Sequence, residues 1–356
     1  MVRHITNVIK EYQDRLYETP YVPKTSYRRD SLGYCGDVNK NFLTFLFSDQ
    51  ATVTQFLKDV GLIRSKVQCN SCGRDMTCYA DPNIPGGFRW RCRRMVAGTR
   101  CFRSRSIRHG SWFQEGLYLT YHILRRESAK DIQHEHHFSD HTIADWGMFC
   151  REAMLVYLEG CSEKIGGPNK TVEIDDSNFG LRKYYRGHPV KGQCVFGGVE
   201  RESGRTFLVL ILDRTANALT NVIHAWIEAG TTLISDCWAA YRDIGSHGYT
   251  PRTINHNICF VNPDARDHTN IIECTWRHVK ACLGPHHRRE DYEFHLAHYM
   301  FATRCEAQGV SQFSRLLAIA TSTDWSSCTT PATSGWHISI SYMLSAMGGG
   351  AIPQNQ

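Results

Sequence analysis

Three acidic residues in the second half of the chain occupy positions where a divalent-metal nuclease needs carboxylates. Asp175 follows the apolar part of TVEIDD, Asp236 ends the run TTLISD, and Glu273 lies within HTNIIECTWRHVK. Carboxylates grouped in this way bind two Mg²⁺ ions about 4 Å apart, one activating the attacking oxygen and the other stabilising the leaving oxygen. For any one of these residues alone, the alternative is an ordinary surface charge.

The elements that carry these residues belong to residues 168–315, where strand-like and helical patterns follow in the order β-β-β-α-β-α-β-α. The expected strands are 171–176, 193–200, 206–212, 231–236 and 250–256, and the expected helices are 217–229, 238–244 and 268–283. This order places the first and fourth strands side by side in a mixed sheet. We therefore expect Asp175 and Asp236 to approach each other and the last helix to bring Glu273 to them.

A cation accompanies the acidic cluster. Lys280 lies seven residues after Glu273, two turns along the same helix face. We expect its ammonium group to hold a DNA phosphate near the metal ions.

Cysteine spacing predicts a second, structural metal centre in residues 64–110. Cys69 and Cys72 form a CxxC pair, and Cys92 and Cys101 follow about twenty residues later. Zn²⁺ takes four thiolates in this layout of a zinc ribbon. Cys78 is a competing ligand, and scattered free cysteines are the alternative. The 15 cysteines are odd in number, and residues 1–17 carry charges where a secretory leader needs an apolar stretch, so we expect a reducing compartment.

The same segment is strongly basic. Residues 64–108 contain 11 Lys and Arg against two acidic residues, a net charge of +9 in a chain whose total is +6. Such a block favours a polyanion partner, with a solvated basic face as the alternative. The arginines that we expect on DNA phosphates are Arg89, Arg91, Arg93, Arg94, Arg103, Arg105 and Arg108.

The remaining segments frame these modules. We expect a loosely structured arm and short helices in 1–63, a helical region in 111–165 and a tail in 316–356. Within the helical region, Ser128–Ile132 and Ser139–Arg151 have the pattern of a helix-turn-helix, with Ser139 as N-cap. The histidines around Glu135 predict a solvated polar turn rather than a metal site, because adjacent helix positions do not face each other.

The blocks VEIDDSNFGLRKYYRG, ISDCWAAYRDI and HTNIIECTWRHVK resemble the three catalytic blocks of Merlin-type DDE transposases, eukaryotic relatives of bacterial insertion-sequence transposases. The 36 residues between Asp236 and Glu273 and the offset of Lys280 fit that family's spacing. The upstream stretch WRCRR…CFRSRSIRHGSWF is similar to its zinc ribbon. The resemblance covers about residues 60–315.

This resemblance implies an α/β fold with an RNase H-like catalytic core, preceded by the zinc ribbon and the small helical domain. It implies that Asp175, Asp236 and Glu273 are the metal-binding triad, although Asp176 competes with Asp175 for the first place. Asn270 matches a position where some bacterial relatives carry Asn, and it supports the site.

The expected function is an Mg²⁺- or Mn²⁺-dependent DNA transposase that also binds Zn²⁺. It would bind terminal inverted repeats, hydrolyse the phosphodiester at the element end and join the 3′-OH to target DNA. Because two ends must be held together, we expect a homodimer. No apolar run is long enough to span a membrane, and the eukaryotic resemblance implies the nucleus. The alternatives are a host-adopted DNA-binding protein and a structure-selective nuclease that cuts without joining.

Overall fold

The computed structural model describes most of the chain. The described residues are 1–17, 38–63, 66–69, 71–81, 88–93, 95–96, 99–100, 103–106, 110–161, 163–179, 193–211, 214–236, 244–254, 268–283 and 291–322. They form two compact units, one made of Met1–Ala153 with Ser311–Gln356 and the other of Met154–Val310. No helix in the described part is long and apolar enough to cross a membrane.

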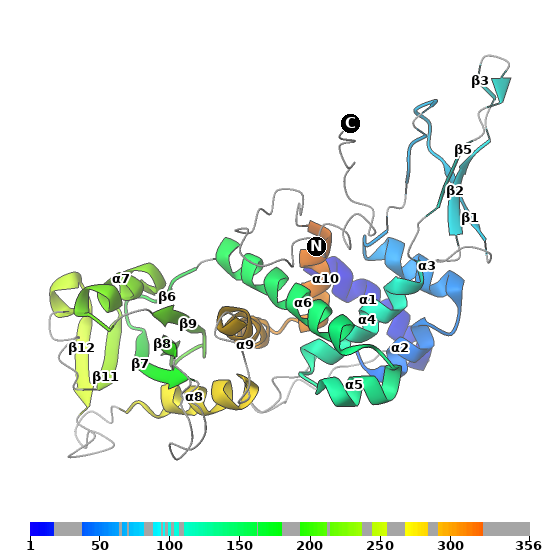
Figure 1. Ribbon diagram of the computed structural model, residues 1–356. Helices are drawn as coiled ribbons and strands as arrows, with labels where there is room; N and C mark the ends of the chain where they lie inside the picture. The colour runs from blue at the N-terminus through cyan, green and yellow to red at the C-terminus, as the bar shows by residue number, and fades with distance from the viewer. Residues whose placement is uncertain are drawn as a thin grey trace, which may run out of the picture. The chain divides into compact units, whose positions relative to one another are not determined.

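The second unit is built on a five-stranded mixed sheet with the order β12-β11-β7-β8-β9 (Figure 1). Its strands are β7 (Thr171–Phe179), β8 (Gln193–Glu200), β9 (Thr206–Ile211), β11 (Thr232–Asp236) and β12 (Thr250–Ile254). The pairs of β8 with β7 and β9 are antiparallel, whereas β11 pairs in parallel with both β7 and β12. The first and fourth strands of this sheet are therefore neighbours, as the sequence predicted.

Helices cover both faces of the sheet. Helix α7 (Ala216–Trp226) packs through Leu219 and Ile223 into a core with Val172, Ile174 and Leu233. Helices α8 (Asn270–Leu283) and α9 (Tyr292–Ala307) contact the sheet through β7, β8 and β9. Figure 1 shows α7 and α8 on opposite sides of the sheet. Sequence periodicity extended the first of these helices to residue 229, but Ile227–Glu228 instead forms β10, which pairs with β6 (Ile165–Gly166).

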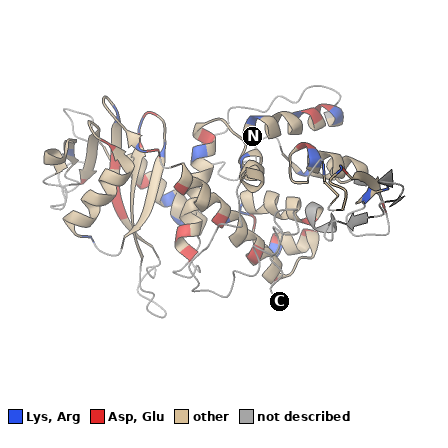
Figure 2. Cartoon of the chain, turned by 90° about the horizontal axis from the view of Figure 1, so that it is seen from above, with Lys and Arg blue, Asp and Glu red and all other residues tan. Residues whose placement is uncertain are grey.

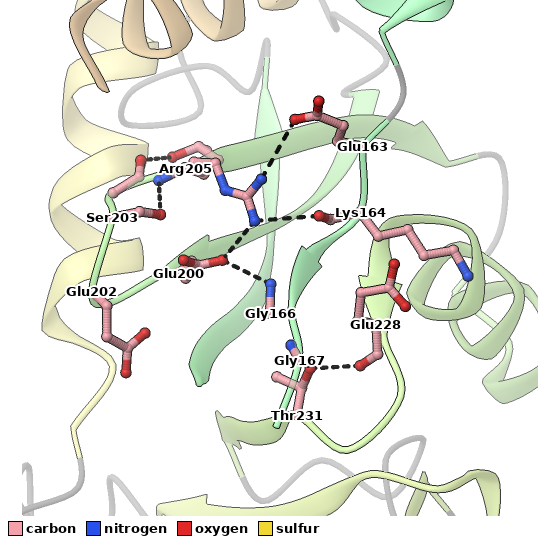
Figure 3. A network of polar contacts seen from close by, with 12 residues as sticks. Glu163, Lys164, Gly166, Gly167, Glu200, Glu202, Ser203, Arg205, Glu228 and Thr231 are labelled. Carbon is pink, nitrogen blue, oxygen red and sulfur yellow. Dashed lines mark hydrogen bonds and ion pairs between the residues drawn. The ribbon is translucent and has the colours of Figure 1, made fainter. Parts of the chain in front are cut away.

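A polar network ties β6 to the hairpin between β8 and β9 (Figure 3). The side chain of Glu200 is almost fully buried and accepts hydrogen bonds from the backbone N–H of Gly166 at 2.8 Å and from Arg205 Nη2 at 3.0 Å. Thr231 Oγ1 accepts from the Gly167 N–H at 2.8 Å. These bonds satisfy backbone groups where the chain enters the sheet, which buried structure requires.

The first unit contains a bundle of helices. They are α1 (Val2–Tyr17), α2 (Lys40–Leu46), α3 (Gln50–Asp59), α4 (Gly110–Leu124), α5 (Ala129–His136), most of α6 (Asp140–Gly160) and α10 (Gln312–Ser322). Two expectations are corrected here. The start of the expected N-terminal arm is helix α1, whose Ile5, Val8, Ile9 and Tyr12 bury one face. The first residues of the expected tail belong to α10, which contacts α1 and α4.

Helices α5 and α6 follow each other through a three-residue turn, with His137 in the left-handed conformation. The Ser128 hydroxyl accepts from the Asp131 N–H, and the Ser139 hydroxyl accepts from the Thr142 N–H. Both serines therefore cap their helices, because a hydroxyl at the N-cap satisfies a free N–H of the first turn. The cap at Ser139 was predicted, and the cap at Ser128 is an addition from the structure.

The polar residues before this turn differ from the expectation. His134 and His137 are exposed as expected, but α5 continues to His136. The ring of His136 is partly buried, and its Nε2 lies 2.9 Å from Nε2 of His122 on α4. The pKa of His136 is lowered, first by the burial of its ring and second by the charge of nearby His122.

A small antiparallel sheet, β1-β2-β5, forms the rest of the first unit's described part. Its strands are β1 (Thr77–Ala80), β2 (Phe88–Cys92) and β5 (Arg103–Ser106), and a second ladder pairs β3 (Met95–Val96) with β4 (Thr99–Arg100). Its small core consists of Val67, Met76, Trp90 and the thiols of the cysteine cluster. So few apolar side chains give little hydrophobic stabilisation, which is typical of modules that depend on a metal.

Candidate active site

Strand β7 presents its acidic residues on two different faces. Successive side chains of a strand alternate, so Glu173, Asp175 and Ser177 share one face. Ile174 and Asp176 point to the other face, where Ile174 joins the core under α7. Figure 2 shows acidic positions, drawn in red, along a central strand of the sheet. The acidic pair therefore divides between the two faces, and only Asp175 is turned toward α8.

Helix α8 lies along this face of β7 and forms hydrogen bonds with three side chains of the strand. The N–H groups of Ile271 and Ile272 donate to Glu173 Oε2 at 2.9 and 3.0 Å. Further along, Trp276 Nε1 donates to Asp175 Oδ2 at 3.0 Å, and Lys280 Nζ donates to Ser177 Oγ at 2.6 Å.

These contacts repeat every two residues on the strand and every four residues on the helix. A strand advances about 6.6 Å in two residues, and a helix advances about 6 Å in four. The two elements therefore stay in step along the whole contact. Gly197 of β8, which pairs with Asp175, leaves room for the Trp276 ring, because a Cβ added at Gly197 would lie 2.8 Å from that ring.

Strand register brings Asp236 to Asp175. The last printed pair of the β7–β11 ladder joins Ile234 to Glu173, and two residues further along the parallel strands stand Asp236 and Asp175. Residues opposite each other in a sheet point to the same face, so both carboxylates lie on the α8 side. The charge of Asp236 also acts on Asp175 and raises its pKa.

Glu273 lies in the first turn of α8 on the helix face that contacts β7. It precedes Trp276 by three residues and Lys280 by seven, spacings that share a face. Its side chain is exposed, and Oε1 accepts from the Thr269 hydroxyl at 3.2 Å. The ligand oxygens of Asp175, Asp236 and Glu273 do not all lie within 4.8 Å of one another. Among the described residues, only a group of three cysteines and a group of two histidines with one glutamate are that close together. A pair of metal ions about 4 Å apart spans a wider set of ligands than one ion does.

Burial is the main influence on the Asp175 carboxyl. The pKa of Asp175 is raised to about 6, by burial first and by the charges of Asp176 and Asp236 to a smaller extent, while hydrogen bonds from the Asp176 N–H and from Trp276 oppose the shift. A buried carboxylate held close to other carboxylates is a site that a divalent cation fits. The donor set suits a hard cation such as Mg²⁺.

Asp176 has its own partners on the opposite face. Arg214 Nη2 donates to Asp176 Oδ1 at 2.6 Å, and Cys194 Sγ lies 3.6 Å from Oδ2. An arginine already neutralises this carboxylate, and its strand position turns it away from α8. We therefore place Asp175, and not Asp176, in the candidate site.

Glu173 is a site residue that the sequence analysis missed. Its side chain is fully buried, and its Oε1 accepts from Arg201 Nε at 2.8 Å. Arg201 Nη2 donates in turn to the His268 carbonyl at 2.5 Å. The carboxylate thus supplies acceptors for N–H groups that a helix start leaves free, and it anchors the turn that carries Glu273. The only sign of this role in the sequence is an acidic residue at a strand position that is turned into the protein.

Three of the four cysteines that were predicted to bind zinc lie in the described part of the chain, and their thiols are close together. The thiols of Cys69, Cys72 and Cys92 lie within 4.8 Å of one another, with Cys72 Sγ 3.5 Å from Cys92 Sγ. The backbone turns tightly between the first two, where the Gly73 N–H donates to the Cys69 carbonyl at 2.7 Å. The Cys78 sulfur is not in this group and accepts from Lys58 Nζ at 3.5 Å. Cys101 lies outside the described residues.

The predicted DNA-binding arginines are only partly described. Arg89 and Arg91 alternate with the buried Trp90 and Cys92 on β2, and both approach Asp81, at 2.6 and 3.6 Å. Arg93 is exposed. Arg103 and Arg105 are placed by register only, opposite Cys92 and Trp90. Arg94 and Arg108 lie outside the described residues, as does most of the helix expected at 238–244.

Comparisons with known proteins give one family match and two similar solved structures. Residues 165–302 match the family model of the ISXO2-like transposase domain. Among solved structures, an intasome of simian T-cell lymphotropic virus in complex with a PP2A regulatory subunit matches at 15% identity over 38% of this chain and 50% of that chain, with a TM-score of 0.26. The HTLV-2 integrase catalytic core domain in complex with magnesium matches at 14% identity over 38% of this chain and 86% of that chain, with a TM-score of 0.23. This chain thus spans about half of the intasome chain that it matches.

No curated protein matches the chain. The family match covers the β7–β12 sheet and most of the two helices that follow it. It contains Asp175, Asp236 and Glu273, so the family likeness and the acidic cluster coincide in one region. Residues 165–302 therefore match an ISXO2-like DDE transposase domain with a mixed α/β, RNase H-like core.

Proposed function

We propose that this protein is a DNA transposase whose acidic cluster cuts and joins DNA at the ends of a mobile element. One observation carries the proposal: Asp175 and Asp236 stand at the same offset beyond the last β7–β11 pair, on the face that α8 covers with Glu273. Carboxylates from two neighbouring strands and one helix are then turned toward the same side of the sheet. We propose further that this protein is a Merlin-type transposase, which rests on the likeness of the three sequence blocks to that family.

The residues of this chain divide the work of the reaction. Asp175, Asp236 and Glu273 would hold divalent cations, which when bound activate an attacking oxygen and offset the charge on phosphorus. Trp276 orients Asp175 by donating to its Oδ2. Lys280, bonded to Ser177 on the same face, offers a cation to a DNA phosphate. A water first attacks the phosphorus at the element end and displaces the 3′-oxygen of the element. The freed 3′-OH then attacks the phosphorus of a target phosphodiester and displaces the 3′-oxygen of the target strand, so each step breaks one P–O bond and forms one.

The ribbon and the helical region would supply DNA binding. The arginines of β2 and the net charge of +9 in residues 64–108 support contacts with phosphates. Cutting and joining two ends together requires two active sites, so we propose a homodimer. A nuclear location follows from the proposed relationship with eukaryotic transposases.

A strand-transfer assay tests the proposal. The full chain is incubated with labelled duplexes carrying the DNA that flanks its coding sequence, a supercoiled target plasmid, and either Mg²⁺ or EDTA. We expect joined product only with Mg²⁺, or with Mn²⁺ in its place. Cut but unjoined DNA would favour a structure-selective nuclease, bound but intact DNA would favour a host-adopted DNA-binding protein, and either outcome would overturn the transposase assignment.

A further inference from the structure

Two helices of the first unit bring three metal-ligating side chains to one point that the transposase chemistry does not use. His122 stands near the end of α4, and Glu135 and His136 are the last two residues of α5. The ligand atoms of these three residues all lie within 4.8 Å of one another. We propose that they bind a divalent transition-metal ion of the Zn²⁺ type, separate from the cysteine cluster and from the acidic cluster.

The distances fit one tetrahedral ion. Nε2 of His122 lies 2.9 Å from Nε2 of His136, and Glu135 Oε2 lies 3.9 Å and 3.8 Å from these two nitrogens. Ligand atoms about 2.0–2.1 Å from a tetrahedral Zn²⁺ are about 3.3 Å apart. The three observed edges therefore lie on both sides of the ideal value, and shifts of a few tenths of an ångström would equalise them.

A carboxylate behind His122 sets the ring for ligation. Glu127 Oε2 lies 2.5 Å from His122 Nδ1, and Arg125 Nε donates to Glu127 Oε1 at 2.8 Å. His122 is fully buried. When Nδ1–H donates to Glu127, Nε2 carries the lone pair and points at His136. A carboxylate on the remote ring nitrogen is the usual partner of a metal-ligating histidine.

The ligand types select the class of ion. Two imidazoles and one carboxylate suit Zn²⁺ and similar ions better than Mg²⁺ or Ca²⁺, which prefer oxygen ligands. Three protein ligands among the described residues leave the fourth position to water. Glu135 is also bonded to Lys40 at the start of α2, so an ion here would join α2, α4 and α5. Its role is to fix α5, the first helix of the helix-turn-helix, on α4.

Metal content of the full chain tests the site. The wild type, His136→Gln and His134→Gln are purified without chelator, checked for folding by circular dichroism, and analysed for zinc by mass spectrometry. His134 is exposed on the same helix and outside the cluster, so it is the matched control. We expect His136→Gln to lose about one zinc ion per chain and His134→Gln to lose none. Equal zinc in all three proteins would overturn the proposal.

A spectroscopic measurement keeps the test decisive if His136→Gln fails to fold. Co²⁺ replaces zinc in the wild type and in Cys72→Ser, which disables the thiolate centre. We expect Cys72→Ser to keep a Co²⁺ d–d spectrum that lacks thiolate charge transfer, as nitrogen and oxygen ligands give. If the only bound Co²⁺ shows thiolate ligation, the His122–His136 pair shares a proton instead of an ion, and the site does not exist.

Discussion

The acidic cluster and the cysteine cluster assemble by opposite means. Asp175, Asp236 and Glu273 come from two strands and a helix, with 60 and 36 residues between them, and the sheet register and α8 place them. Cys69 and Cys72 share one tight turn, and Cys92 joins them from the nearby strand β2. A large core holds the carboxylates, whereas the thiols make up much of their own small core.

This contrast has an energetic consequence. The fold keeps the Asp175 carboxyl buried beside other carboxylates, and burial first and their charges second raise its pKa, so removing one of these acids should leave the fold intact. The cysteine module has few apolar contacts, and binding energy from zinc becomes folding energy in such modules. Loss of a ligand should therefore abolish chemistry at the first centre and structure at the second.

The largest expected effect is that of Glu273→Gln. The amide keeps the shape of the side chain but removes a charge that the metal ions need, so strand transfer should fall on the order of 100-fold or more. DNA-end binding and thermal stability should stay near the wild-type values. Gel-based joining assays measure the rate, with exposed Glu228→Gln on β10 as the control.

Asp236→Asn should behave in the same way, and the double variant should be little worse than either single one, because the ligands act as a unit. Wild-type joining by Glu273→Gln would show that the acidic cluster is misassigned and would make Asn270 the next residue to test.

Glu173→Gln should give the next largest effect, and it tests whether register and helix docking place Glu273. The single amide oxygen of Gln can accept only some of the hydrogen bonds that Ile271 N–H, Ile272 N–H and Arg201 Nε now donate to Glu173. Arg201 also loses its negatively charged partner. We expect a loss of about 2–4 kcal/mol in the free energy of unfolding.

The same variant should reduce joining about tenfold or more at a temperature where it remains folded. Raised Mg²⁺ should recover part of the rate if the carboxylates are only displaced, a rescue that Glu273→Gln should not show. A Glu173→Gln protein with the wild-type rate and wild-type Mg²⁺ dependence would remove Glu173 from its positioning role.

Cys72→Ser tests the other side of the comparison. Removing one thiolate should release the zinc ion that we propose here and weaken DNA-end binding about tenfold or more, because the binding energy of such an ion becomes folding energy of the module. The catalytic unit should keep its unfolding transition in calorimetry. Cys161→Ser, outside the cluster, is the control. Unchanged zinc content and end affinity in Cys72→Ser would mean that the ligands are misassigned.

Sequence reasoning succeeded where a pattern is local and repetitive. Strand β8 has the predicted bounds, and β9 and β11 differ from prediction by one residue each, because apolar runs bounded by turns define them. The order of these strands sufficed to place Asp175 next to Asp236. Ser139 was identified as an N-cap from local sequence alone.

Long-range polar contacts carried no such pattern. Glu173 bonds to N–H groups 98 and 99 residues away, and nothing near it in the sequence marks that contact. His122 lies outside the histidine-rich turn, so the turn alone showed no facing pair. Helix α1 was missed for a different reason: the prolines and glycines that follow it dominated the composition, although its apolar residues have a helical period.

The smallest expected effect concerns the cost of keeping the buried Asp175 carboxylate charged beside its acidic neighbours. The pKa of Asp175 is about 6 in the folded chain against 3.8 ordinarily, so between about pH 4 and pH 6 the folded state binds more protons than the unfolded state. Stability therefore falls as the pH rises through this window, and the cost is complete above it. Because an amide at this position would carry no charge, Asp175→Asn should raise the free energy of unfolding by about 1–2 kcal/mol at pH 7.5 in EDTA, allowing for partial exposure. Near pH 3.5 the two proteins should unfold alike.

Urea unfolding at the two pH values measures this difference, and Asp176→Asn is the matched control on the opposite face of β7. Asp176 is already paired with Arg214, so its removal should leave stability unchanged or lower it at pH 7.5. Mg²⁺ should reverse the order of Asp175→Asn and the wild type, since an ion that binds only the intact carboxylates stabilises only the wild type. If Asp175→Asn is destabilised at pH 7.5 without metal, burial and the neighbouring charges do not penalise the Asp175 carboxylate, and the two centres do not differ in the way proposed.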